Sequence, residues 1–348
     1  MLREIGGRPV GAGAPVYVIA ELGLNHSGSV ERALAMVDAA AWAGASAVKL
    51  QTLRAEALVA AVCPAPAHVQ AESLRAFFTG FELDEAAHRA IVRRARERGL
   101  AVLATPFALD LVPMLQRIGI DAFKIASGDL TFDRLIAATA ATGRPLVVST
   151  GMSTLPEVDH AFAVARTAGG SALAALHCVS AYPTPAASRN LRAIATLAAH
   201  LPGPVGLSDH SEGAVSALGA VALGATLYER HLVLEYDDRA VDRAVSSTPS
   251  ELRALIAQMD ELRVSLGDGR KVPQPAERPN LVPSRRGLYA VRRLAPGTRI
   301  TEADVEIVRP ASGLAPGAVD ALVGAVVRRE IEAGAPFEAG DLALERAS

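Results

Sequence analysis

Residues 204–231, PVGLSDHSEGAVSALGAVALGATLYERH, hold the pattern that decides the fold. Two strand-like runs, 204–208 and 225–229, are separated by a Gly- and Ala-rich segment with the period of a helix. Both runs end in polar side chains: Ser208, Asp209 and His210 in the first, Glu229 and His231 in the second. A strand, a helix and a second strand predict a βαβ unit, whose parallel strands end on the same side.

The same alternation repeats along most of the chain. Further strand-like runs occupy residues 16–20, 46–51, 101–105, 122–126, 145–149 and 174–178, and helical stretches such as 31–44, 84–99 and 155–169 lie between them. Eight such units, ending in a helix at 249–267, predict a (β/α)8 TIM barrel. A doubly wound open sheet also alternates in this way. It is disfavoured because the first strand leads into ELGLNHSG (21–28) rather than a GxGxxG turn.

Composition narrows the function classes. The 348 residues carry a net charge of -2, so there is no basic surface for nucleic acid. The longest mainly apolar stretch, 213–227, has 15 residues, short of the roughly 20 that span a bilayer as a helix. The two cysteines make a weak disulfide framework, and no secretory signal pattern opens the chain. We therefore expect a cytoplasmic protein without nucleic acid or membrane partners.

The texture changes after Gly267. Residues 271–283, KVPQPAERPNLVP, contain four prolines and predict a stiff linker, able to reach about 40 Å at about 3.1 Å per residue in polyproline II form. A small β-rich domain, 284–348, follows the barrel domain (1–270) and this linker. It holds an internal repeat, APGTRITEADV (295–305) and EAGAPFEAGDL (332–342), offset by 37 residues. At that size we expect it to bind or cover something rather than to act as a second enzyme.

Lysine is rare enough to be informative. Of 35 basic residues only three are lysines, and two of these, Lys49 and Lys124, lie at predicted strand ends. Catalytic groups of (β/α)8 barrels gather at that rim. Two ammonium groups among Ser, Thr and Gln side chains can hold a phosphate and a carboxylate. Two alternatives stay open: a salt bridge to a neighbouring carboxylate, and a Schiff-base lysine.

His210 and His231 end adjacent predicted strands, whose axes lie about 4.8 Å apart. Two imidazoles so placed can hold one divalent ion and leave positions open for water and substrate. Structural histidines are the alternative.

A set of ordered motifs resembles those of the sialic acid synthase family, the phosphoenolpyruvate-condensing synthases of nonulosonic acids. The motifs are IAELGLNHSG (19–28), AGASAVKLQT (43–52), LATPF (103–107), FKIASGD (123–129), VVSTGM (147–152), LHCVSAYPTP (176–185), VGLSDHSEG (205–213) and YERHL (228–232). IVRPASGL (307–314) resembles a motif of the family's C-terminal SAF, or antifreeze-like, domain. The resemblance covers about the whole chain.

The resemblance implies a reaction between phosphoenolpyruvate and an N-acylated aminosugar, with release of phosphate through C–O cleavage. It implies a Mn²⁺ or Mg²⁺ ion at His210 and His231. Residues at phosphoenolpyruvate-binding positions are Lys49, Thr105, Lys124, Ser127, Ser149, Ser180 and Ser208; those at sugar-binding positions are Glu21, Gln51, Tyr182, Asp242 and Arg309. Glu21, both lysines and both histidines are the expected catalytic groups. Arg309 matches the arginine that one subunit inserts into its partner's site, which implies a domain-swapped homodimer.

Three departures from the family pattern concern the acceptor side. Asp129 stands where many members have Glu, and Ser180 where some have Asn. Residues 235–242 lack the usual Gly-Pro, so Asp242 is assigned from its spacing to Ser246. The sugar is therefore left open between N-acetylmannosamine and a bacterial 6-deoxy diacetamido sugar. Two other functions also stay open: a Schiff-base aldolase or lyase, and a non-catalytic carbohydrate-binding protein.

Overall fold

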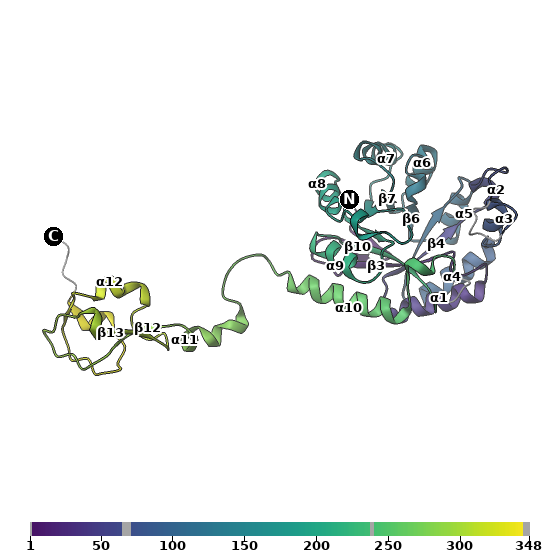
Figure 1. The fold of residues 1–348 in the computed structure, drawn as a ribbon. Helices are drawn as coiled ribbons and strands as arrows, with labels where there is room; N and C mark the ends of the chain where they lie inside the picture. Colours follow the sequence, from purple (N-terminus) through teal and green to yellow (C-terminus); the bar gives the residue numbers. More distant parts are fainter. Residues whose placement is uncertain (1, 65–70, 237–239, 344–348) are drawn as a thin grey trace. The chain divides into compact units, whose positions relative to one another are not determined.

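The structure, a computed structural model, describes residues 2–64, 71–236 and 240–343. Its backbone separates into two compact units, Met1–Gly267 and Asp268–Ser348. The first contains all the long helices, and the second is built from short strands and single helical turns (Figure 1).

The first unit is a closed barrel of parallel strands. In chain order the strands are β3 (Tyr17–Gly23), β4 (Ala47–Thr52), β5 (Ala101–Pro106), β6 (Ala122–Ile125), β7 (Leu146–Ser149), β8 (Leu173–Cys178), β9 (Val205–Asp209) and β10 (Leu227–Leu232). Each pairs with the next, and β10 pairs with β3 to close the ring. A short strand, β11 (Ser246–Ser247), pairs in parallel with the last two residues of β10, His231 and Leu232. The predicted (β/α)8 fold is confirmed.

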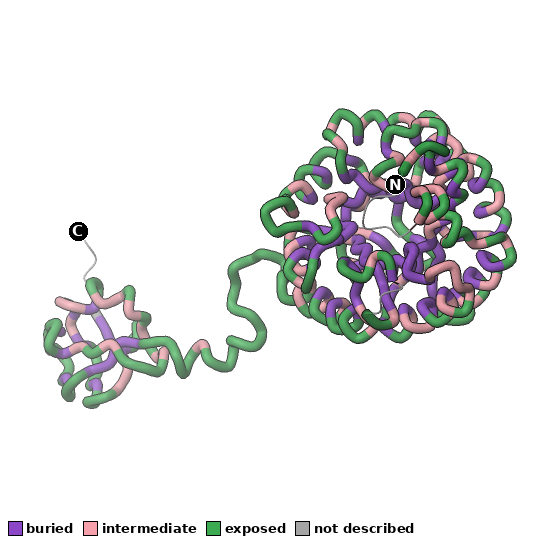
Figure 2. Tube along the Cα trace, turned by 45° about the vertical axis from the view of Figure 1, so that its right-hand side comes forward, coloured by how far each residue is buried: buried purple, intermediate pink, exposed green. Residues whose placement is uncertain are grey.

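Helices surround the strands. They are α1 (Val30–Ala43), α4 (Glu85–Glu97), α5 (Leu111–Ile118), α6 (Asp133–Ala140), α7 (Leu155–Thr167), α8 (Ala193–His200), α9 (Val215–Ala222) and α10 (Pro249–Ser265), with the short α2 (Ala55–Leu58) and α3 (Leu74–Thr79) before α4. Figure 2 shows the ring of buried strands inside a ring of helices whose outer sides are exposed. Ser29 caps α1 and Thr248 caps α10, each accepting a backbone N–H of the first helical turn.

Alternate strand residues enter two separate cores, because successive side chains point to opposite faces. Val18, Ala20 and Leu22 of β3 pack outward in the core shared with the helices. Tyr17 and Ile19 pack inward, in a second core at the N-terminal ends of the strands. There the hairpin β1 (Glu4–Ile5) and β2 (Arg8–Pro9) closes the barrel, with Ile5 fully buried. The Tyr17 hydroxyl donates to the Ile5 carbonyl at 3.3 Å.

The second unit has its own core. It contains β12 (Gly287–Ala290), β13 (Val305–Val308), α12 (Val319–Leu322), β14 (Val326–Val327) and β15 (Leu342–Ala343). Ile300 and Phe337, equivalent in the internal repeat, are both buried there. The equivalent Asp304 and Asp341 each accept a backbone N–H three residues earlier and pair with Arg292 and Arg329 respectively. The two halves of the repeat therefore form the same kind of turn, each held by an aspartate that pairs with an arginine.

The proline-rich segment is not uniformly extended. It contains a 3-10 helix, η4 (Pro275–Asn280), followed by the short α11 (Leu281–Ser284). Proline is compatible with the first turn of a helix, where no N–H partner is needed. The segment 271–283 therefore spans less than the length expected for polyproline II, because a 3-10 helix rises only about 2 Å per residue.

The structure also bears on the two cysteines and on the expectation that no helix spans a membrane. Cys63 and Cys178 are free thiols. Over the described residues, none of the helices is both long and apolar enough to cross a membrane.

The hairpin plug gives a test of the barrel interior. Ile5→Ala should lower the free energy of unfolding by about 2–5 kcal/mol, because it leaves a cavity at a fully closed end. Val264→Ala on α10, where the side chain is 69% exposed, should change it by less than about 0.5 kcal/mol. Denaturant titration measures the unfolding free energy of both variants. Equal losses would contradict the conclusion that the β1–β2 hairpin closes the N-terminal end of the barrel.

Candidate active site

Polar side chains form the inward layer at the C-terminal ends of the strands. Buried members are Glu21 (β3), Lys49 (β4), Thr105 (β5), Lys124 (β6), Ser149 (β7), Ser208 (β9) and Glu229 (β10). The register aligns Glu21 with Lys49 and Ser208 with Glu229. The alternate residues that face inward are thus apolar at the N-terminal ends of the strands, and they supply seven polar groups at this rim.

Lys49 lies at the centre of a buried ion group. Its Nζ is 2.5 Å from Glu21 Oε2 and 3.5 Å from Glu229 Oε1. The Ser208 hydroxyl donates to Glu229 Oε1 at 2.9 Å. Burial lowers the pKa of Lys49 to about 8, although Glu229 opposes the shift. Burial alone would raise the pKa of Glu229, but Lys49 and Lys124 bring it down to about 2. Both groups are therefore charged at neutral pH.

Lys124 has a different environment. Its Nζ donates to Ser149 Oγ at 2.6 Å and to the Ile125 carbonyl at 2.9 Å. In the described part of the chain it makes no ion pair with a carboxylate within 4.0 Å. Asp129 is close enough to feel its charge, but burial raises the pKa of Asp129 to about 6. Lys124 thus presents a buried cation held by neutral oxygens, which favours an anionic ligand.

Hydroxyl groups lie beside the two lysines. Ser127 Oγ accepts the Gly151 N–H at 3.0 Å. A Cβ atom at Gly151 would lie 2.7 Å from the hydroxyls of both Ser127 and Ser180, so these two serines converge on one point. Thr105 Oγ1 is buried and has no hydrogen-bond partner. An unpaired buried hydroxyl is costly, and a ligand oxygen would satisfy it.

The two predicted metal ligands are neighbours. The ring centroids of His210 and His231 are 5.5 Å apart, and Tyr182 stacks on His210 at 4.0 Å. His210 Nδ1 is 3.0 Å from the Val179 carbonyl, which can only accept, so Nδ1 donates there and the neutral form of the ring has its lone pair on Nε2. His231 Nδ1 is buried without a hydrogen bond, 3.4 Å from Asp242 Oδ2.

These observations fit a divalent ion held by two imidazoles. The described residues contain no group of three His, Cys, Asp or Glu side chains arranged to hold a metal. An ion here would need water or substrate oxygens to complete its coordination, as in open catalytic sites.

Two other predicted sugar-binding residues are Gln51, in register with Thr105 of β5, and Arg309. Gln51 is half-buried near the end of β4. Arg309 belongs to the second unit, where it is exposed directly after β13. The strand-end pattern placed Glu229 at the rim but gave it no role. Its alternation with the outward-facing Tyr228 and Arg230 was the available signal.

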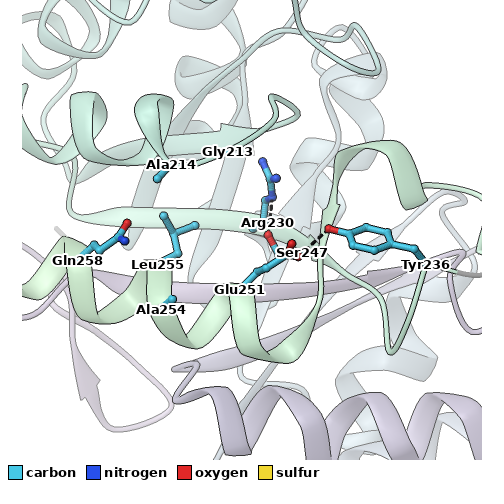
Figure 3. A pocket seen from close by; sticks show the side chains of 9 residues that line it. All are labelled: Gly213, Ala214, Arg230, Tyr236, Ser247, Glu251, Ala254, Leu255 and Gln258. Atoms are coloured by element: carbon cyan, nitrogen blue, oxygen red, sulfur yellow. Dashed lines mark hydrogen bonds between the residues drawn. The ribbon is translucent and has the colours of Figure 1, made fainter.

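Arg230 supports the rim from outside the barrel. It donates to Ser247 Oγ at 3.1 Å, bonds the Ser211 carbonyl and lies 3.4 Å from Asp209 Oδ2. A cavity of about 230 Å³ adjoins it, lined also by Gly213 and Ala214, which precede α9, and by residues of α10 (Figure 3). Two other residues that line this cavity are joined by a hydrogen bond, in which the Tyr236 hydroxyl donates to Glu251 at 2.6 Å. Arg230 thereby ties the loop after β9 to β11.

Comparison with known proteins identifies the family. The NeuB family model matches residues 36–271, and the SAF domain model matches residues 285–343. The chain belongs to the NeuB family. It is 33% identical over 346 residues to N,N'-diacetyllegionaminic acid synthase of Legionella pneumophila, covering 95% of this chain and 96% of that protein. It is 32% identical over 340 residues to pseudaminic acid synthase of Campylobacter jejuni, covering 94% and 96%.

A solved NeuB-type structure agrees with the fold. The sialic acid synthetase of Leptospira borgpetersenii, crystallised with citrate, is 33% identical and superposes with a TM-score of 0.71 over 80% of this chain and 94% of that one. The predicted membership of the sialic acid synthase family, with its SAF domain, is confirmed.

The buried ion group predicts an acid-sensitive stability in this NeuB protein. The pKa of Glu229 lies at about 2, below its ordinary 4.5, so its stabilising effect is complete above pH 4.5 and is lost as the pH falls toward 2. Glu229→Gln should flatten the fall in unfolding free energy across this window. Denaturant titrations at several pH values measure it. Glu56→Gln, at an exposed site, should keep the wild-type slope; a Glu229→Gln slope equal to wild type would refute the assignment.

Proposed function

We propose that this protein condenses phosphoenolpyruvate with the aldehyde form of an N-acylated aminosugar, giving a nonulosonic acid and inorganic phosphate. The observation that carries the proposal is the buried Lys124, whose ammonium group, among the described residues, bonds the neutral oxygens of Ser149 and Ile125. Lys49, whose ammonium group is paired with Glu21 and Glu229, is the second lysine of the same rim. The names of the relatives, synthases of legionaminic and pseudaminic acids, support the product class.

The reaction requires two bond-forming steps. C3 of phosphoenolpyruvate attacks the aldehyde carbon, which forms the C–C bond and leaves C2 electron-deficient; the aldehyde oxygen takes up a proton to become a hydroxyl group, and the water that adds at C2 releases one. Water then adds at C2, and phosphate leaves with the bridging oxygen, so that a keto acid remains. Lys49, Lys124, Thr105, Ser127, Ser149, Ser180 and Ser208 would bind the phosphate and carboxylate. Preorganised donors in a site shielded from water stabilise the charge that develops.

The acceptor sugar would lie on the side of the histidines. Glu21, Gln51, Tyr182 and Asp242 offer carboxylate, amide and phenol groups that suit sugar hydroxyls. Tyr182 is 53% exposed above the ring of His210, so it can contact a ligand that enters from solvent. A Mn²⁺ or Mg²⁺ ion held by His210 and His231 would polarise the aldehyde.

A Schiff-base aldolase is the second candidate. The lowered pKa of Lys49, about 8, favours it, since a neutral amine is needed for attack on a carbonyl. The two carboxylates next to Lys49 disfavour it, because they stabilise the ammonium form. Borohydride with a keto acid should leave no adduct at Lys49 or Lys124; a trapped adduct would favour the aldolase.

The proposal is tested by phosphate release from phosphoenolpyruvate. A panel of N-acyl hexosamines and 6-deoxy diacetamido sugars should contain an acceptor that gives stoichiometric phosphate and keto acid. Chelator should abolish the release, and Mn²⁺ or Mg²⁺ should restore it. Absence of release with every sugar, in protein shown to be folded and metal-loaded, would contradict the proposal and favour a binding protein.

Lys124→Met should weaken phosphoenolpyruvate binding far more than sugar binding. Loss of a desolvated charge contact costs roughly 2–5 kcal/mol. Lys271→Met is the matched control, because Lys271 is exposed in the second unit. Steady-state KM values for both substrates, together with calorimetric binding of phosphoenolpyruvate, distinguish the effect on phosphoenolpyruvate binding from the effect on sugar binding. Unchanged affinity in Lys124→Met would show that the lysine is structural.

We further propose that Arg309 acts in the partner's site of a homodimer. It is exposed, and the described residues offer it no ion pair within 4.0 Å. Mixing Arg309→Ala subunits with Lys124→Met subunits should then restore activity, up to half the sites of each heterodimer, because one site receives both intact residues. Phosphate release after mixing measures it. No recovery, with heterodimers verified by mass, would contradict action across the interface.

A further inference from the structure

Asn25 lies fully buried where the loop after β3 meets residues 242–246. Its Nδ2 donates to the Leu232 carbonyl at 2.8 Å and to Ser246 Oγ at 2.9 Å. Its Oδ1 accepts the Asp242 N–H at 2.9 Å. Ser246 Oγ in turn donates to the Asp242 carbonyl at 2.7 Å. One amide therefore holds the end of β10 and both ends of the segment 242–246.

The residues before Asn25 also contact Asp242. Gly23 has φ of +50°, and a Cβ atom there would lie 3.2 Å from Asp242 Oδ2 and 3.1 Å from His231 Nδ1. Burial raises the pKa of the Asp242 carboxyl, and the nearby Leu24 backbone N–H opposes that rise. Residues 23–25 thus form a backbone and amide surface on which the Asp242 carboxylate rests, 3.4 Å from His231 Nδ1.

We propose that Asn25 is a positioning residue, which sets the Asp242 carboxylate against His231 and thereby determines how the acceptor sugar is held. This rests on the proposed function, in which Asp242 binds the sugar. Asn25 is fully buried, both N–H groups of its side chain are engaged and its Oδ1 accepts the Asp242 N–H, so it is not placed to bind a ligand itself. Its effect must therefore pass through the segment 242–246.

Asn25→Asp is the sharpest substitution. It keeps the size of the side chain and the acceptor for the Asp242 N–H, but it removes both N–H donors. A carboxylate would then face the Leu232 carbonyl, an acceptor that it cannot bond. Ser246→Ala removes one bond of the same network, so it should act in the same direction with a smaller effect.

Hydrogen exchange gives a readout that needs no substrate. In the wild type the Asp242 amide should be protected by its bond to Asn25 Oδ1. In Asn25→Ala that protection should fall at least about tenfold, which is the scale of one lost buried hydrogen bond, while the amides of β10 stay protected. Unchanged exchange at Asp242 would overturn the inference whatever the enzyme's activity.

Kinetics supply the second readout. Asn25→Asp should raise the KM for the sugar about tenfold or more and leave the KM for phosphoenolpyruvate within about twofold. Thr139→Val is the matched control: Thr139 is fully buried in α6 and bonds only its own helix, so its loss costs stability without changing the ratio of the two KM values. Equal changes in both KM values for Asn25→Asp would overturn the inference. An inactive wild type would instead contradict the proposed function, with the exchange result unaffected.

Discussion

The ion group of Lys49, Glu21 and Glu229 is the constraint on which the upper half of the barrel depends. Charges removed from water are costly unless each has a partner and supporting hydrogen bonds. Here one ammonium group lies within 4 Å of two carboxylates, and Ser208 supplies a further donor. The excess negative charge is balanced by Lys124 nearby, which contributes to the lowered pKa of Glu229. Removal of Lys49 would leave both buried carboxylates without the ammonium group that pairs with them.

This constraint explains the division of the barrel into two ends. The N-terminal ends are filled by apolar side chains and closed by the hairpin that carries Ile5. In the described strands, the inward polar groups therefore lie at the C-terminal ends. The outward face follows the same rule, since Arg230 is buried with Asp209, Ser211 and Ser247 rather than alone. A rigid barrel thus positions charges that would be unstable in a flexible loop.

Much of this was accessible from the sequence, for a physical reason. Strands have a period of two, and in a (β/α)8 barrel the last inward residue of each strand reaches the rim. That rule placed Lys49, Lys124, Ser208 and both histidines without reference to any contact. It could not give Glu229 its role, because the ion pairs of a rim residue depend on side-chain directions across the barrel. Asn25 was also beyond it, since its partners come from a loop more than 200 residues away. The helical turns within the proline-rich segment were likewise set by local backbone geometry that composition does not specify.

In the proposed reaction, water adds at C2 of phosphoenolpyruvate and phosphate leaves by C–O cleavage. Phosphoenolpyruvate labelled with ¹⁸O in the oxygen that bridges C2 and phosphorus reports on it directly. The reaction is run with the sugar that supports phosphate release. Mass spectrometry of the products should then find the label in inorganic phosphate and none in the keto acid. Label retained in the keto acid would mean that the P–O bond breaks, and it would contradict the account.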